Sequence, residues 1–270
     1  MITITAKEFE QIVAYVKESY GLNLAEKKHL LEGRFQQVLQ QLNFTSFTEY
    51  FDYLKQDKSG AAVVDFINKI TTNHTFFMRE ADHFYFFRDQ VLPHLERTVK
   101  DRDLRIWSAG CSSGEEPYTL AMIMADYFKN RKYLWDTRIL ATDISRKVLT
   151  IASEGVYSRE QVTVLPEQWQ KDYFVKCDSE HYRVANSIHR EVVFRAFNLT
   201  NPVFPFKKKF HVIFCRNVMI YFDVSTKQEL LRKFYEHTEP GGYLFIGHAE
   251  SISHDQSLYR YIKPAVYRKE

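Results

Sequence analysis

A glycine-bearing turn followed by two carboxylates forms the chemically richest stretch of the sequence. Residues 107–118 read Trp-Ser-Ala-Gly-Cys-Ser-Ser-Gly-Glu-Glu-Pro-Tyr, which places Gly110 and Gly114 just before Glu115 and Glu116. Glycines let the backbone approach a ligand closely, but the two carboxylates would repel a pyrophosphate and the spacing is not G-x-G-x-x-G. A ligand with a sulfonium and an ammonium group suits these carboxylates. The alternative is that they only stabilise the start of a helix.

Two further polar positions follow candidate strands. Asp143 ends one strand and can accept hydrogen bonds from both ribose hydroxyls of an adenosyl group; it could instead cap the next helix, as Ser145 could. Asn198 and Leu199 end the next strand and could address the edge and face of an adenine, or form an Asn turn. Because the carboxyl ends of parallel strands meet at one edge of an open sheet, these positions predict a single nucleoside-binding rim.

The elements that must position these residues begin at Asp103. There the sequence changes to short apolar runs that alternate with helical stretches, which is typical of an α/β fold with a doubly wound parallel sheet. We expect strands at 104–109, 138–141, 192–197, 211–215, 243–246 and 265–267, and helices at about 116–129, 145–153 and 225–237. Residues 156–190 exceed an ordinary connection. Because 173–175 could pair with 181–184, we expect an inserted subdomain at about 156–190.

The region before Asp103 reads as helical. Thr5-x-x-Glu8 and Ser46-x-x-Glu49 are capping-box patterns that open two of four expected helices. The apolar stripes of the four helices are Phe9, Ile12, Val13, Val16 and Tyr20; Leu31, Phe35, Val38 and Leu42; Phe47, Tyr50, Phe51 and Leu54; and Val63, Phe66, Ile67 and Ile70. A longer helix over about 81–98 should break near Pro93. We therefore predict a helical domain over 1–80, a linker helix over 81–102 and a catalytic domain over 103–270.

Composition excludes several classes of protein. The 37 basic and 34 acidic residues leave a net charge of +3, too little for a general nucleic-acid binder. Cys111, Cys177 and Cys215 form no CxxC pair, so we expect neither a disulfide framework nor a zinc site, and a cytoplasmic location. No stretch approaches the roughly 18 apolar residues of a membrane span. The ten histidines contain no HExxH pattern, and we expect no metal.

Four sequence blocks together carry a family resemblance. They are Asn-His-Thr-Phe-Phe-Met-Arg-Glu at 73–80, Gly-Glu-Glu-Pro-Tyr at 114–118, Phe-Cys-Arg-Asn-Val-Met-Ile-Tyr-Phe-Asp at 214–223 and Gly-His-Ala-Glu-Ser at 247–251. Their order and spacing resemble those of the chemotaxis receptor glutamate methyltransferases of the CheR type. The resemblance implies a Rossmann-like S-adenosylmethionine-dependent methyltransferase domain, with an N-terminal helical domain and a small inserted antiparallel β subdomain.

The resemblance also implies a set of functional residues. Arg79 and Tyr221 match the family's active-site arginine and tyrosine, although an ion pair and a core aromatic are the alternative roles. The implied cofactor-binding positions are Asn73, Thr75, Arg79, Glu116, Asp143, Asn198, Leu199, Arg216 and Asn217. The implied reaction converts glutamate side chains of chemotaxis receptors to methyl esters in sensory adaptation, and it leaves S-adenosylhomocysteine without the help of a metal.

Partner recognition rests on weaker signals. Basic residues around Lys27, Lys28 and Arg34 could meet an acidic helical surface of a receptor, or they could be a solvated face. Residues 207–209, three lysines, are expected to be a solvated loop. Some proteins of the CheR type use the inserted subdomain to grip a receptor's C-terminal tether by strand addition. Here the turn at 177–180 is short and lacks glycine, so we expect tether-independent recognition.

Two other functions remain as competing hypotheses. The same fold could methylate RNA or a small molecule, but the near-neutral charge disfavours RNA and the block at 73–80 favours the receptor enzyme. A catalytically silent protein that binds the cofactor as a sensor or scaffold is the second, and the presence of both Arg79 and Tyr221 disfavours it.

Overall fold

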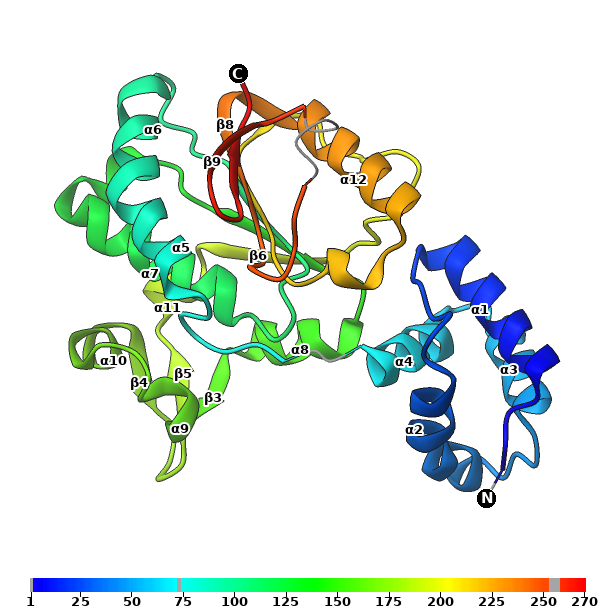
Figure 1. Ribbon diagram of the computed structural model, residues 1–270. Helices are drawn as coiled ribbons and strands as arrows, with labels where there is room; N and C mark the ends of the chain where they lie inside the picture. The colour runs from blue at the N-terminus through cyan, green and yellow to red at the C-terminus, as the bar shows by residue number, and fades with distance from the viewer. Residues whose placement is uncertain (1, 72–73, 253–257) are drawn as a thin grey trace. The chain divides into compact units, whose positions relative to one another are not determined.

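The computed structural model describes residues 2–71, 74–252 and 258–270. Its contacts divide the chain into two compact units (Figure 1). The helical unit comprises Met1–Asn73 and Tyr221–Gln228, and the sheet unit comprises His74–Ile220 and Glu229–Glu270. Within the described residues no helix is both long and apolar enough to cross a bilayer.

Over its described N-terminal residues, 2–71, the helical unit contains four helices, as predicted: α1 (Ala6–Tyr20), α2 (Lys28–Gln41), α3 (Phe47–Gln56) and α4 (Ala61–Ile70). The predicted capping box of Thr5 and Glu8 is present. Phe35, Phe47 and Phe66 are fully buried at its centre. Leu42, which we placed in the apolar stripe of the second helix, is 46% exposed because α2 ends one residue before it.

The helical unit also takes in a segment that lies far away in the sequence. The backbone N–H of Asn23 donates to the carbonyl of Tyr221 at 2.8 Å, and Leu22 pairs with Phe222 in an antiparallel bridge. Lys17 lies 3.1 Å from Asp223. The chain therefore returns to its N-terminal region immediately after η3 (Met219–Tyr221).

The sheet unit is built on seven strands in the order β6-β2-β1-β7-β8-β10-β9. They are β1 (Ile106–Ala109), β2 (Ile139–Asp143), β6 (Val192–Ala196), β7 (Phe210–Cys215), β8 (Thr238–Ile246), β9 (Arg260–Lys263) and β10 (Val266–Arg268). The five strands from β6 to β8 in this order are parallel and β10 runs antiparallel to β8. The expected doubly wound sheet is confirmed; β9 is an additional edge strand.

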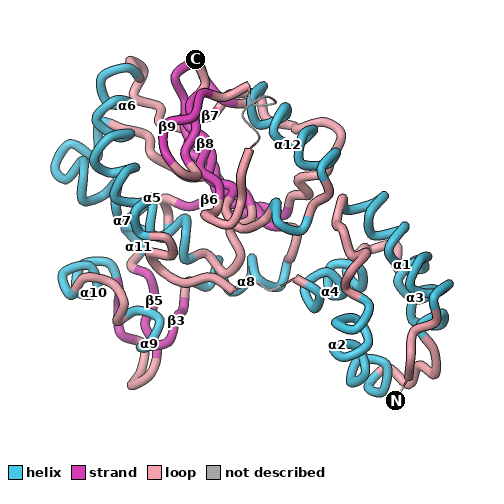
Figure 2. Tube along the Cα trace, viewed as in Figure 1, coloured by secondary structure: helices cyan, strands magenta, loops and turns pink. Residues whose placement is uncertain are grey.

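Helices cover both faces of this sheet (Figures 1 and 2). They are α7 (Glu115–Phe128), followed by η2 (Lys129–Leu134), α8 (Arg146–Glu154) and α12 (Val224–Glu236). Neighbouring residues of β1 face opposite layers, as a strand requires. Ile106 joins the core formed with α7, whereas the ring of Trp107 lies 5.4 Å from that of Phe234 on α12.

The expected helix before the sheet runs from residue 81 to 98 and is interrupted as predicted. It consists of α5 (Ala81–Phe86), a π-helical turn η1 (Phe87–Val91) and α6 (Leu92–Thr98). Pro93 is the second residue after the widened turn. Its missing N–H and its ring are incompatible with the regular α-helical pattern over the preceding turn, which explains why the helix widens there.

The inserted subdomain contains a three-stranded antiparallel sheet in the order β3-β5-β4. Its elements are β3 (Val156–Ser158), α9 (Arg159–Val162), α10 (Glu167–Tyr173), β4 (Phe174–Lys176), β5 (His181–Val184) and α11 (Asn186–His189). The predicted hairpin is β4 and β5, and β3 and the short helices are additional. Trp169 donates to Asp126 on α7 at 3.1 Å, which fastens the subdomain to the helices that cover the seven-stranded sheet.

Candidate active site

The glycine-bearing turn follows β1 and is tied to the end of β2. The N–H groups of Gly110 and Cys111 both donate to the carbonyl of Thr142, at 2.8 and 2.9 Å. Gly110 has a φ of +90°, and a Cβ there would lie 2.4 Å from the side chain of Val218. Only glycine fits this position. Because the turn follows β1 and is bonded to the end of β2, it lies at the carboxyl ends of neighbouring parallel strands, where nucleotide-like ligands bind.

Asp143 lies at the end of β2 with one backbone partner for each oxygen. Its carboxylate accepts from the N–H groups of Ser112 and Ser145, both at 2.9 Å. The side chain that caps α8 belongs to Ser145, so Asp143 is not that cap. Burial raises the pKa of Asp143, although the backbone donors of Ser145, Ser112 and Ile144 oppose the shift. Because a carboxylate has about four acceptor sites, both oxygens can still accept ribose hydroxyls.

The two glutamates at the start of α7 have different surroundings. Glu116 accepts from Ser108 Oγ at 2.8 Å and from Arg216 at 2.9 Å. Glu115 is only 1% exposed and accepts from Ser113 Oγ at 2.7 Å and from Gln161 of the inserted subdomain at 3.4 Å. Burial raises the pKa of Glu115. We expected both carboxylates to suit a cationic ligand, but Glu115 is taken up by the protein interior.

The inserted subdomain contacts the glycine-bearing turn through a tyrosine as well. The hydroxyl of Tyr157 donates to the carbonyl of Ser113 at 2.7 Å. Gly114 has a φ of +97°, and a Cβ there would lie 3.0 Å from this hydroxyl and 2.9 Å from Ala152. Tyr157 and Gln161 therefore hold the turn from one side while Thr142 holds it from the other.

Arg216 connects the residues implied for catalysis and for cofactor binding. It follows β7, is 6% exposed, and donates to Glu116 at 2.9 Å and to Glu80 at 3.1 Å. The same guanidinium donates to the backbone carbonyl of Arg79. Its plane lies over the ring of Phe84, with 5.1 Å between the guanidinium carbon and the ring centroid. A buried cation shared by two carboxylates fixes the segment around residue 79 against the start of α7.

The segment before α5 presents Arg79 and Thr75. The side chain of Arg79 folds back so that Nη1 donates to the carbonyl of His74 at 2.5 Å. Thr75, the residue after His74, is half-buried. Asn73, the other residue implied here, lies outside the described residues. The guanidinium of Arg79 thus has no carboxylate partner within the described residues, unlike that of Arg216.

Asn198 and Leu199 follow β6, at the edge of the sheet next to β2. The carbonyl of the Asn198 side chain accepts from the N–H and the hydroxyl of Thr200, at 3.0 and 2.8 Å, so the Asn turn that we considered is present. The amide NH₂ group remains as a donor. Leu199 is buried and supplies an apolar surface beside it.

Asn217 closes the rim with help from the loop after β8. It has a φ of +59°, and its backbone N–H donates to Glu250 at 3.0 Å. Its side chain donates to Glu80 at 3.2 Å. Gly247 packs so closely that a Cβ there would lie 2.4 Å from Nδ2 of Asn217. Burial raises the pKa of Glu250, which accepts three backbone N–H groups from this loop and the residues after β7.

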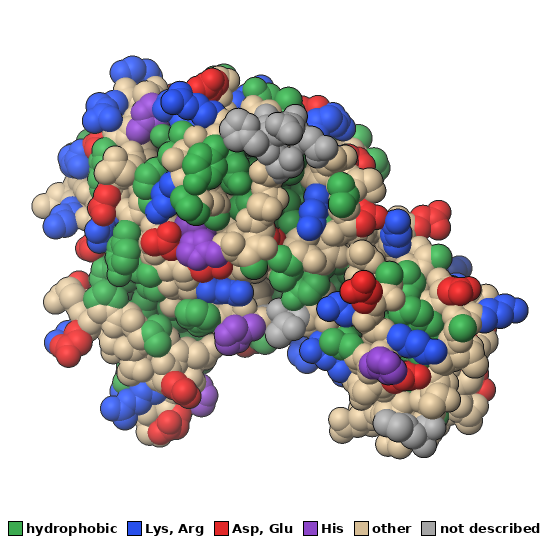
Figure 3. All heavy atoms as spheres, viewed as in Figure 1, with side chains coloured by type: hydrophobic (Ala, Val, Ile, Leu, Met, Phe, Trp, Pro, Cys, Tyr) green, Lys and Arg blue, Asp and Glu red, His purple; other side chains and the backbone are tan. Residues whose placement is uncertain are grey.

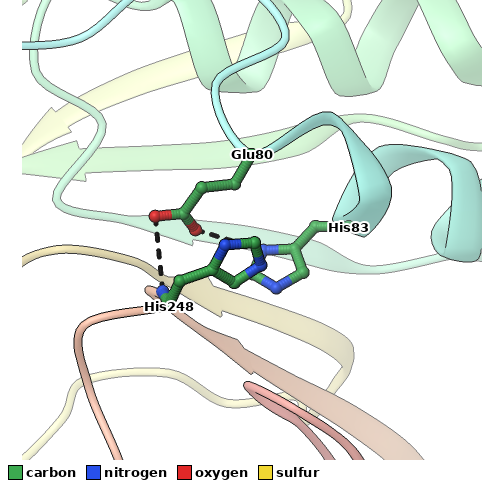
Figure 4. Close-up of side chains that lie close together, drawn as sticks. All are labelled: Glu80, His83 and His248. Atoms are coloured by element: carbon green, nitrogen blue, oxygen red, sulfur yellow. Dashed lines mark hydrogen bonds and ion pairs between the residues drawn. The ribbon is translucent and has the colours of Figure 1, made fainter.

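Glu80 belongs to this hydrogen-bonded network, although the sequence analysis assigned it no role. Figure 4 shows its carboxylate facing His83 of α5 and the backbone N–H of His248. Burial alone would raise the pKa of Glu80, but Arg216 and Asn217 hold it below its ordinary value. The sequence did contain one indication of this contact, because Glu80 and His248 both lie in sequence blocks that carry the family resemblance.

Comparison with known families decides the identity of this arrangement. The model of the CheR methyltransferase all-alpha domain matches residues 7–71, and that of the CheR methyltransferase SAM binding domain matches residues 73–267. The chain belongs to the CheR methyltransferase family. Its relatives include the chemotaxis protein methyltransferase of Borreliella burgdorferi, which is 41% identical over 272 residues, covering 99% of this chain and 96% of the relative.

Two further CheR relatives match at similar coverage. The chemotaxis protein methyltransferase of Escherichia coli K12 is 35% identical over 94% of this chain and 87% of its own length. Chemotaxis protein methyltransferase 2 of Vibrio cholerae is 33% identical over 99% of this chain and 94% of its own length. The resemblance stated from sequence blocks is therefore confirmed: this CheR chain is an S-adenosylmethionine-dependent methyltransferase of chemotaxis.

The rim of this CheR chain fits S-adenosylmethionine in its donor set. Asp143 offers acceptors for ribose and Glu116 offers a carboxylate for an ammonium group, while Gly110, which packs against Val218, holds the turn at the end of β1. Tyr221 belongs to the helical unit, where its backbone accepts from Asn23. The structure brings Arg79, Glu116, Arg216 and Asn217 into one hydrogen-bonded network, while Asp143 and Asn198 occupy the neighbouring strand ends.

Proposed function

We propose that this protein transfers the methyl group of S-adenosylmethionine to glutamate side-chain carboxylates of chemotaxis receptors, giving glutamate methyl esters. The observation that carries the proposal is the link through Arg216, which bonds both Glu116 and the backbone of Arg79. This link joins the backbone of Arg79, whose guanidinium has no carboxylate partner in the described residues, to the carboxylate that we assign to the cofactor. A site for methylating a carboxylate requires such a pairing of anion-binding and cation-binding groups.

The chemistry requires positioning more than proton transfer. A glutamate carboxylate has an ordinary pKa of about 4.3, so it is already a nucleophile at neutral pH and needs no general base. Bound S-adenosylmethionine supplies an electrophilic methyl group on a sulfonium. Arg79 would hold one face of the carboxylate in a fixed orientation, since a guanidinium binds carboxylates through two parallel hydrogen bonds. Alignment of this kind lowers a barrier by several kcal/mol, about 7–11 in well-oriented model reactions.

Tyr221 is the second residue that we assign to catalysis. Its phenol can donate or accept one hydrogen bond and can border the transferred methyl group without ionising at neutral pH. We assign the placement of the reacting groups to Tyr221 and Arg79 together. If arginine alone bound the carboxylate too strongly, it would stabilise the bound substrate instead of the transition state.

The cofactor-binding residues keep their proposed roles. Asp143 would bind the ribose, Asn198 and Leu199 the adenine, and Glu116 the ammonium group, with Asn73, Thr75, Arg79, Arg216 and Asn217 completing the site. The amide donor of Asn198 and the buried face of Leu199 support the adenine assignment. We also keep the proposed division into a helical domain over 1–80, a linker helix over 81–102 and a catalytic domain over 103–270.

Receptor recognition would use the basic side chains at the start of α2. Lys27 and Lys28 are available for an acidic helical surface of a receptor. Arg34 is engaged with its own fold, because its Nη1 donates to the carbonyls of Lys69 and Ile70, at 2.7 and 2.9 Å, at the end of α4. On the face visible in Figure 3, basic and acidic side chains are interspersed, so this surface resembles no nucleic-acid groove of a single sign.

We propose that the protein recognises receptors without their C-terminal tether. The four-residue turn between β4 and β5 is closed by Asp178, whose carboxylate accepts from the N–H groups of Glu180 and His181 at 2.7 and 2.8 Å. Titration with receptor C-terminal peptides in a calorimeter should give no micromolar binding. A saturable micromolar isotherm would overturn this part of the proposal.

The cytoplasmic face of the receptor is the proposed place of action. Cys111, Cys177 and Cys215 are all free thiols, and this is the state expected in a reducing compartment.

Transfer of labelled methyl groups tests the function directly. The purified chain, labelled S-adenosylmethionine and receptor-containing membranes should yield label on receptor bands that mild base releases as methanol. Label that resists base would exclude carboxyl esters. Label on RNA or on a small molecule in place of the receptor would favour that alternative, and cofactor binding without transfer to any of these would favour a silent sensor or scaffold.

A further inference from the structure

Three potential metal ligands, distant in sequence, converge beside the active-site network. They are Glu80, His83 and His248, and one ligand atom from each lies within 4.8 Å of those from the other two (Figure 4). Nδ1 of His83 lies 3.4 Å from Oε2 of Glu80. Ligand atoms held about 2 Å from a common zinc ion in a tetrahedron lie roughly 3.3 Å apart. The Glu80–His83 pair therefore already has the spacing of two ligands of one ion.

The second observation concerns His83 alone. Its side chain is fully buried, and neither ring nitrogen makes a hydrogen bond within the described part of the chain. Leaving a buried polar atom unpaired costs about 1–3 kcal/mol, so native proteins rarely tolerate it without a reason. The ring of His248 approaches to 4.5 Å between centroids. The unpaired nitrogens of His83 thus occur inside the same group of ligands.

We propose that Glu80, His83 and His248 bind a divalent transition-metal ion of the zinc class. Two imidazole nitrogens and one carboxylate oxygen are a donor set that suits Zn²⁺, and three protein ligands leave a fourth position for water. A bound ion would satisfy the buried ring of His83. It would also join the start of α5 to the loop after β8, which carry Glu80 and His248 respectively.

The surrounding charges favour a cation. Asp82 lies 3.2 Å from Nε2 of His248 and 3.3 Å from Lys263, so it both orients the imidazole and adds negative charge. A carboxylate behind a ligating imidazole is the usual outer partner in zinc sites. Glu80, Asp82 and Glu116 face Arg216 and Lys263, which leaves three carboxylates against two cations.

The ion would compete with Arg216 for one oxygen of Glu80. Oε2 lies 3.1 Å from Arg216 and 3.4 Å from His83, while Oε1 accepts from Asn217 and from the backbone of His248. Oε1 can keep its donors when Oε2 turns to the ion. None of the three ligands is a residue that we assign to the cofactor, but Glu80 is also the hydrogen-bond partner of Arg216 and Asn217, which we do assign to it.

Calorimetric titration of the full chain with Zn²⁺ tests the proposal without any assay of transfer. The protein should lack an added histidine tag and carry Cys177→Ser, because the exposed thiol would compete for zinc. We expect one ion per chain, a melting temperature that rises with zinc concentration, and visible absorption of a four-coordinate ion when Co²⁺ replaces zinc.

Two ligand variants and one control decide the assignment. His83→Gln and His248→Gln should each weaken binding by at least about 10-fold, whereas His29→Gln, whose side chain is 98% exposed on α2, should not. His248→Gln decides alone if the buried His83→Gln variant loses its circular dichroism. Absence of saturable binding at one ion per chain, or unchanged affinity in His248→Gln, would overturn the proposal.

Discussion

The backbone N–H of Asn23 donates to the carbonyl oxygen of Tyr221 at 2.8 Å, across nearly two hundred residues of sequence. Together with the Leu22–Phe222 bridge and the Lys17–Asp223 ion pair, this bond makes residues 221–228 part of the helical unit. The tyrosine that we assign to the active site is therefore held by the N-terminal region. Displacing Tyr221 through this bond is therefore a direct test of the role that we propose for it.

Removal of this one bond should slow transfer. Asn23→Pro deletes the N–H donor, and we expect a loss of about 1 kcal/mol in stability and a fall in kcat of about 10-fold as Tyr221 shifts. Asn23→Ala is the matched control because it keeps the N–H and loses only the side-chain contact with Ala25. Equal kcat values for the two variants in the methyl-transfer assay would contradict this role.

Arg79→Ala should abolish transfer while it largely spares cofactor binding. In the described residues the guanidinium of Arg79 makes no hydrogen bond or ion pair to another side chain, and only the backbone carbonyl of Arg79 joins the Arg216 network. We expect turnover to fall by about 100-fold or more because the substrate carboxylate loses its alignment. Calorimetry with S-adenosylhomocysteine should give an affinity close to that of the parent protein. Unchanged turnover would remove Arg79 from the proposed mechanism.

Gly247→Ala should weaken cofactor binding. An added Cβ would lie 2.4 Å from Nδ2 and 2.8 Å from the backbone nitrogen of Asn217, so the residues after β7 must move. We expect a loss of about 1–3 kcal/mol in stability and a measurable drop in affinity for S-adenosylhomocysteine. The control is Gly33→Ala in α2, where nothing lies within 4 Å and about 0.5–1 kcal/mol should be gained. Full affinity in Gly247→Ala would show that Asn217 tolerates displacement.

Glu115→Gln should stabilise the protein at neutral pH. Burial raises the pKa of Glu115 above its ordinary value of 4.5, so the folded state holds this proton more tightly than the unfolded state. The free energy of unfolding from this group is therefore highest below that ordinary value and falls as the pH rises through the folded pKa. Glutamine cannot ionise and should lose that part of the pH dependence.

Denaturant unfolding at a series of pH values, from below 4.5 to neutral, measures how the free energy of unfolding depends on Glu115. The exposed Glu154→Gln change provides the control for removal of one negative charge. Parallel stability curves for Glu115→Gln and the parent protein would refute the predicted cost of burying this carboxylate.

The central strands were predictable because they are buried on both faces and appear as continuous apolar runs. In β7 all six residues are buried, and the predicted strand differs from it by one residue. β9 escaped prediction because its sequence, Arg-Tyr-Ile-Lys, lies at the sheet edge and is largely exposed. β3 has three residues, too few for a pattern to show.

The candidate site was predictable in its residue types but not in its connections. Asp143 and the glycine turn follow from strand ends and local spacing, which are properties of neighbouring residues. The bonds from Arg216 to Glu80 and Glu116 span 136 and 100 residues, and no local pattern predicts them. For the same reason Arg34 was interpreted as a surface cation, although it binds the last carbonyls of a helix two elements away.

The position of Tyr157 and Gln161 has a consequence for evolution and engineering. Their hydrogen bonds reach Ser113 and Glu115, on either side of Gly114. The inserted subdomain that carries them therefore supports the turn that we assign to the cofactor, in addition to being a candidate docking surface. Replacing the inserted subdomain with a short connection should leave this turn less firmly held. A minimal catalytic core of this enzyme therefore has to retain the subdomain even if no partner binds to it.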